Sequence, residues 1–117
     1  MFVVSSLHDN LPQTVLEATA CGTPVVGFAV GGIPDMVRPG VTGLVVPAQD
    51  VSALRAAIRM LLQDPALRAA MATNCRRLAV QEYALEVQAR RYIALYEEIV
   101  SQPRPVQTAP ALPSVAV

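Results

Sequence analysis

The stretch Ser5–Glu17, SSLHDNLPQTVLE, decides the fold of this chain. The apolar run Met1–Val4 precedes it, which predicts a short β-strand that passes into a polar loop. Pro12 suits the first turn of a helix, because the N–H that proline lacks would have no partner there and its φ angle is already helical. The sequence thus predicts a strand, a loop and a helix N-terminus in direct succession.

The predicted helix start is suited to an anion. The first backbone N–H groups of a helix have no partner within it, and the helix dipole places partial positive charge at the same end, so the loop has the character of a phosphate-binding turn. Asp9 lies in the loop and Glu17 lies about one turn inside the helix, so they do not form a close acid–base pair. We interpret them as hydrogen-bond acceptors for different parts of one long ligand. The alternative is an ordinary strand–loop–helix corner with a solvated aspartate.

The rest of the chain alternates between apolar runs and helical patterns, which predicts an α/β fold with about three parallel strands and a helical block after them. Gly22 is expected to end the first helix, and Asp50 and Asp64 are suited to cap two later helices. The first apolar run is consistent with an interior strand of the sheet. The predicted strands are 2–5, 25–30 and 43–46, and the predicted helices are 12–20, 34–37, 51–62, 65–81 and 85–100.

Apolar side chains recur at helical spacing in the two helices after residue 50, which predicts that each turns one face to the core. The first stripe consists of Leu54, Ala57, Ile58, Leu61 and Leu62. The second consists of Leu67, Met71, Cys75, Leu78 and Ala79.

The composition fits one small packed domain and argues against several classes of partner. The chain has 117 residues, of which 53% are hydrophobic and 15% charged. Nine arginines and no lysine are scattered along it, and the net charge is zero. No basic surface for nucleic acid or for anionic lipid is therefore indicated.

The two cysteines, Cys21 and Cys75, form no C-x-x-C pair, and His8 is the only histidine, so neither a zinc site nor a disulfide framework is indicated. A nucleophilic cysteine needs a histidine partner, so both cysteines are expected to pack in the core as reduced thiols of a cytoplasmic protein. His8 is either a proton carrier or a loop residue at the edge of a cleft.

No targeting signal is expected at the start of the chain or in its longest uncharged stretch. Residues 18–34 carry no charge, but glycines and prolines interrupt these 17 residues, so no membrane span is expected. No basic region precedes the first apolar run, so no signal peptide is expected. Residues 101–117 hold four prolines and one charge, which predicts a disordered tail. A chain that opens on a buried type of strand is expected to be one part of a larger protein.

Three segments together resemble a known family: Asp9-x7-Glu17, ATACGTPVV at 18–26 and GGIPD at 31–35. Over about residues 2–100 the chain resembles the C-terminal, donor-binding half of retaining family-4 glycosyltransferases of GT-B architecture. The resemblance implies a remnant of a Rossmann-like sheet, with residues 1–100 as a partial nucleotide-sugar-binding domain. It also implies the transfer of a hexosyl group from a nucleotide diphosphate sugar to an acceptor.

In that family the first acidic residue of an E-x7-E pattern contacts the donor sugar, the second holds the ribose, and backbone amides between them meet the diphosphate. The resemblance thus implies that Asp9 contacts the donor sugar and that Glu17 holds the ribose. Asp9 stands where the family usually has a glutamate, so its side chain is one methylene shorter. The phosphate segment would be Asn10, Leu11, Pro12, Gln13 and Thr14.

The resemblance also implies what lies outside this chain. Family members place arginine and lysine on the phosphates from strands upstream, and their acceptor site lies in an N-terminal domain. No catalytic residue is therefore assigned here, and the isolated chain is expected to be inactive. No cofactor or metal is expected, the donor is a UDP- or GDP-sugar, and any membrane association would come through the missing domain.

The terminal helix of those enzymes reaches back toward the N-terminal domain, which predicts an exposed apolar patch on residues 85–100. Two alternatives stay open beside the enzyme hypothesis: a non-catalytic α/β module that binds a nucleotide or docks a partner through this helix, and a decayed fragment without a role. Gly31–Gly32 either faces the donor or forms a plain turn.

Overall fold

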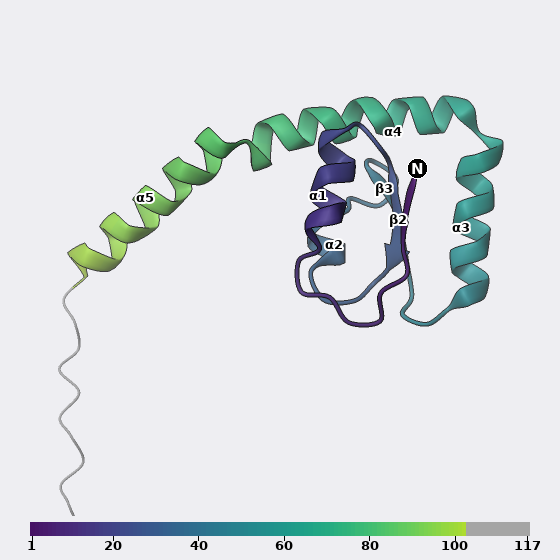
Figure 1. Ribbon diagram of the computed structural model, residues 1–117, viewed down its shortest axis with the longest axis horizontal. Coiled ribbons are helices and arrows are strands. Elements are labelled where there is room, and N and C mark those ends of the chain that lie inside the picture. Colours follow the sequence, from purple (N-terminus) through teal and green to yellow (C-terminus); the bar gives the residue numbers. More distant parts are fainter. Residues whose placement is uncertain (103–117) are drawn as a thin grey trace, which may run out of the picture.

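The structure, a computed structural model, describes residues 1–102 and contains a three-stranded sheet with helices on both faces (Figure 1). All strands are parallel, in the order β1-β2-β3, with Phe2 beside Val25 and Val26 beside Leu44. The predicted α/β fold with a parallel sheet is confirmed. The strands are β1 (Phe2–Val4), β2 (Val25–Phe28) and β3 (Gly43–Val46).

Within residues 1–102 the first strand, whose apolar sequence is consistent with an interior strand, lies at an edge of the sheet. β1 forms an edge of the sheet because it pairs with β2 alone, and its Val3 side chain is 38% exposed. An apolar sequence indicates burial, but it does not tell which neighbouring strand is present.

The helices follow the predicted order, with ends shifted by no more than one residue. The exception is the predicted helix 65–81, which ends at Leu78 and passes into a π-helical segment, η1. The helical elements are α1 (Gln13–Ala20), α2 (Ile33–Met36), α3 (Val51–Gln63), α4 (Pro65–Leu78), η1 (Ala79–Tyr83) and α5 (Leu85–Ser101). The predicted tail at 101–117 lies outside the described residues from 103 onward, and Ser101 belongs to α5.

Two apolar cores lie on the two faces of the sheet. Successive residues of a strand point to opposite faces, so Val25 packs with Val15 of α1 and Ile33 of α2, whereas Val26 packs with Leu61 of α3 and Met71 of α4. Figure 1 shows α4 lying across the ends of both α1 and α3, so one helix closes both layers.

The caps of these helices explain their boundaries. Asp50 accepts a hydrogen bond from the N–H of Ala53, and Asp64 accepts one from that of Leu67, both at 2.8 Å, so the predicted N-caps are confirmed. Both predicted stripes face the core, except that Leu62 is 60% exposed. Leu62 is turned about 100° around the helix from the buried Leu61, which places it on the solvent side of α3.

Helix α1 ends as its sequence predicts. Gly22 has a positive φ of 68°, its N–H donates to the carbonyl of Thr19, and the N–H of Thr23 donates to that of Ala18. This pair of bonds is the Schellman arrangement, which a glycine accommodates without strain. The chain is thereby turned directly from α1 into β2.

Helix α5 differs from every other helix of eight or more residues in residues 1–102, because none of its own residues is buried. It extends away from the sheet (Figure 1), and the predicted apolar patch is exposed, including Tyr92, Ile93 and Tyr96. No helix in residues 1–102 has both the length and the apolar character that crossing a membrane requires.

Candidate functional site

The loop between β1 and α1 lies at the carboxyl end of its strand, which is where open α/β sheets bind ligands. His8, Asn10 and Leu11 are exposed and Asp9 is half-buried. Pro12 is buried and stands at the N-cap, one residue before the first residue of α1. The loop is therefore fixed by a buried proline while its polar residues remain open to solvent.

The start of α1 has free backbone donors. No side chain caps this helix, and the first turn closes through a 3.0 Å bond from the N–H of Val15 to the carbonyl of Pro12. Among the hydrogen bonds of residues 1–102, none uses the N–H groups of Gln13 or Thr14, which are exposed residues. These two donors, together with the positive end of the helix dipole, can bind an anion.

The turn at Gly31–Gly32 packs against this loop. The N–H of Gly32 donates to the carbonyl oxygen of Asn10 at 2.8 Å and lies 3.4 Å from that of Asp9. A Cβ atom on Gly31 would lie 1.6 Å from the Asp9 oxygen, so only glycine fits. The turn thus supports the loop, as a close approach of its backbone to another segment.

Glu17 lies farther along α1, with an exposed side chain that lines a cavity of about 430 Å³ between α1 and the α4–η1 segment. Asp9 does not line this cavity; its backbone carbonyl faces Gly32 of the β2–α2 turn.

Two further residues, Tyr83 and Arg76, line the same cavity as Glu17, and neither was predicted from the sequence. Burial is the main cause that raises the pKa of Tyr83, and the neighbouring Glu82 carboxylate raises it further, so the phenol stays protonated near neutrality. The Tyr83 side chain also lines a second cavity beside Leu11 and Gln13. A local signal for this position is absent, because a π-helical segment is not visible in apolar periodicity.

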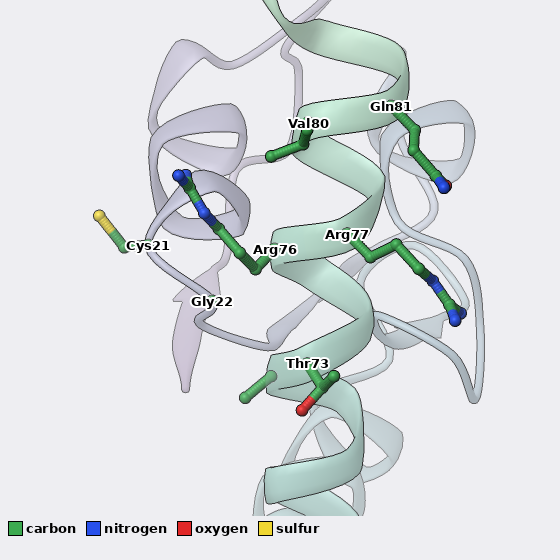
Figure 2. A pocket seen from close by; sticks show the side chains of 8 residues that line it. Cys21, Gly22, Thr73, Arg76, Arg77, Val80 and Gln81 are labelled. Carbon is green, nitrogen blue, oxygen red and sulfur yellow. The ribbon is translucent and has the colours of Figure 1, made fainter.

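A separate cavity lies at the other end of α1 (Figure 2). Arg76 points toward α1 and donates to the carbonyl of Ala20 at 2.9 Å, whereas Arg77 points to the other side of α4. The arginine therefore meets the partially negative end of the helix, so this end does not share the anion-binding character of the start.

Cys21, at the rim of that cavity, is exposed, so the expectation that it packs in the core is wrong. It is the C-cap residue of α1, where the chain turns outward before Gly22. Cys75 is buried as predicted, and its thiol contacts the carbonyl oxygen of Thr42 at 3.2 Å. Within residues 1–102, no group of three or more histidine, cysteine, aspartate or glutamate side chains is placed to hold a metal ion.

The family described as glycosyl transferases group 1 matches residues 1–78. The chain belongs to this family. The matched range of this glycosyltransferase chain includes the β1–α1 loop, the Gly31–Gly32 turn and α4, whereas η1 and α5 lie beyond it.

Relatives of this glycosyltransferase chain are much longer. The D-inositol 3-phosphate glycosyltransferase of Actinosynnema mirum is 46% identical over 71 residues, which are 61% of this chain and 17% of that protein. The GDP-mannose-dependent monoacylated alpha-(1-6)-phosphatidylinositol monomannoside mannosyltransferase of Corynebacterium glutamicum is 40% identical over 96 residues, 82% of this chain and 24% of that protein.

Among solved structures, the sucrose-phosphate synthase of Thermosynechococcus elongatus matches with a TM-score of 0.74 and 36% identity, over 85% of this chain and 25% of that chain. The Rossmann-like, GT-B character of the fold is thereby confirmed. The chain spans a quarter or less of the length of each of these three proteins.

Proposed function

We propose that this chain is the donor-binding part of a retaining glycosyltransferase, which transfers a hexosyl group from a nucleotide diphosphate sugar to an acceptor. The observation that carries the proposal is the start of α1, where unpaired N–H groups, the helix dipole and a loop open to solvent coincide. Membership in a glycosyltransferase family supports it.

Each part of the donor has a proposed contact. The diphosphate lies against the segment 10–14, whose backbone N–H groups stabilise the charge that develops on the leaving group. Asp9 contacts the sugar, and Glu17 accepts hydrogen bonds from the ribose hydroxyls. The donor is a UDP- or GDP-sugar, and the name of the C. glutamicum relative, which specifies GDP-mannose, supports this class.

The proposal leaves the chemical step to a longer protein. The chain spans a quarter or less of its named relatives, and we propose that the acceptor site and the basic residues on the phosphates belong to the remainder. Transfer needs no metal if backbone amides and basic side chains bear the phosphate charge. In this proposal the isolated chain binds the donor without turnover, and it acts in the cytoplasm.

Titration calorimetry with UDP and with GDP tests the proposal. Removing a carboxylate that accepts hydrogen bonds from a ligand costs about 1.5 to 3 kcal/mol, so Glu17→Ala is expected to raise Kd by roughly 10- to 100-fold. Glu86→Ala is the matched control, because Glu86 is an exposed glutamate in the first turn of α5. Equal affinity of the wild type and of Glu17→Ala would reject the ribose contact. Turnover of a nucleotide sugar by the isolated chain would contradict its inactivity.

A second candidate function is a non-catalytic module that docks a partner through α5. The exposed apolar residues of this helix favour it, because large exposed apolar patches are typical of interaction surfaces. Sedimentation of the purified chain separates the two candidates: tight self-association without binding of UDP or GDP supports the module, and nucleotide binding by a monomer supports the donor site.

A further inference from the structure

We infer that Gly31 and Gly32 are positioning residues of the donor site, which hold the β1–α1 loop so that the N–H groups of Asn10 and Leu11 face the ligand. The inference rests on the proposed function, because the ligand is the diphosphate proposed there. It adds two residues that touch the loop backbone and have no side chain to offer a ligand.

The backbone carbonyls of Asp9 and Asn10 both point toward Gly32. The N–H of Gly32 donates to the carbonyl oxygen of Asn10 at 2.8 Å and lies within 3.4 Å of that of Asp9, so both carbonyls point toward the β2–α2 turn. Residues 1–102 contain no cis peptide bond. In a planar trans peptide the C=O and the following N–H point in opposite directions.

The directions of two loop N–H groups follow from that planarity. The Asp9 carbonyl shares its peptide plane with the N–H of Asn10, and the Asn10 carbonyl shares its plane with the N–H of Leu11. Both N–H groups therefore point away from the turn, and no hydrogen bond within residues 1–102 uses either of them. Together with Gln13 and Thr14 they supply four backbone donors around the start of α1.

There is no space for a side chain at Gly31 or Gly32. A Cβ atom on Gly32 would lie 2.1 Å from the Asn10 oxygen, and one on Gly31 would lie 1.6 Å from the Asp9 oxygen. Any side chain at these positions must push the loop backbone away, which rotates both peptide planes. Two glycines in series are thus needed for the orientation of the loop and not only for the turn itself.

The test compares Gly31→Ala and Gly32→Ala with Gly40→Ala. Gly40 also has a positive φ, 75° against 51° for Gly31, but a Cβ atom there would meet nothing within 4 Å. Gly40→Ala thus reproduces the backbone strain without the contact to the loop. We expect both loop variants to raise the Kd for UDP or GDP at least tenfold, and Gly40→Ala to change it less than twofold.

Amide hydrogen exchange of the wild-type chain gives a second measurement that needs no folded variant. The N–H of Gly32 is expected to exchange slowly, while those of Asn10 and Leu11 exchange fast in the free chain and slowly with nucleotide bound. Fast exchange at Gly32, no protection of Asn10 and Leu11 by nucleotide, or wild-type affinity in a folded Gly32→Ala variant overturns the inference. A wild type that binds neither UDP nor GDP overturns the proposed function itself.

Discussion

Helix α1 is short and contributes buried residues to the core, whereas helix α5 is long and contributes none. The length of a helix therefore does not tell whether it packs in this chain. α1 has eight residues, too few to be stable alone in water, yet it buries Val15 and Thr19 and contacts α4, η1 and the sheet. α5 has 17 residues and buries none. The short helix belongs to the packed unit, which consists of the sheet, helices α1 to α4 and η1 and which carries the proposed site, whereas the long helix leaves its apolar side chains exposed.

The largest expected effect on stability comes from shortening a buried isoleucine near α1, and the same change at an exposed isoleucine of α5 is its comparison. Ile33 is fully buried beside α1, and Ile93 of α5 is 57% exposed. Ile33→Ala is expected to lower the free energy of unfolding by about 2 to 5 kcal/mol, because it leaves a cavity in the core. Ile93→Ala is expected to change it by less than about 0.5 kcal/mol. Urea unfolding followed by circular dichroism measures both, and equal losses would show that α5 is part of the packed unit.

The sequence predicted most of this difference. Apolar periodicity, two aspartate caps and Gly22 were sufficient to place the helices of the packed unit, because each of these signals acts within one turn of the chain. The exposed patch on α5 was also predicted, but from a family resemblance and not from the pattern. The same apolar stripe predicts a buried face when a partner is present, so periodicity alone does not distinguish the two.

The site was predicted less completely than the fold. The loop and the start of α1 were located because Pro12 and the acidic pair are close in sequence. The support from Gly31–Gly32 joins residues about twenty positions apart, and a local pattern does not specify which backbone a glycine will contact. Cys21 was misplaced for a related reason: its small apolar side chain suits a core, but its C-cap position turns it outward.

A smaller effect on stability is expected from the ionisation of the Cys75 thiol, which is buried in the packed unit. Burial raises the pKa of Cys75, only partly offset by its backbone hydrogen bond. A raised pKa in the folded state gives stability that is fully present below the ordinary thiol value of about 8.5 and is lost as the pH rises through the folded value. The stability of the wild type relative to Cys75→Ala is therefore expected to fall above about pH 8.5, as measured by urea unfolding at several pH values.

Alkylation by iodoacetamide extends that prediction to the comparison of the two helices. Exposed Cys21 is expected to react in the native chain, and buried Cys75 only when the packed unit opens. Ile33→Ala should accelerate labelling of Cys75, and Ile93→Ala should not. Faster labelling in the Ile93 variant would show that α5 contributes to the stability of the core.

The smallest expected effect lies at the junction between the two regions, where Arg38 and Glu82 form an ion pair at 2.5 Å. Both side chains are partly exposed, and such pairs contribute about 0.2 to 1 kcal/mol. A double-mutant cycle of Arg38→Met and Glu82→Gln is expected to give a coupling energy in this range that decreases with added salt.

The same junction holds α5 by other means, because the backbone carbonyl of Glu82 accepts hydrogen bonds from Gln88 at 2.9 Å and from Arg91 at 3.2 Å. Glu82→Gln keeps that carbonyl, so the first turn of α5 is expected to retain its amide protection when the ion pair is lost. If exchange in α5 instead accelerates in Glu82→Gln, the direction of this helix depends on a surface charge. In that case the boundary between the packed unit and α5 would lie before η1 and not after it.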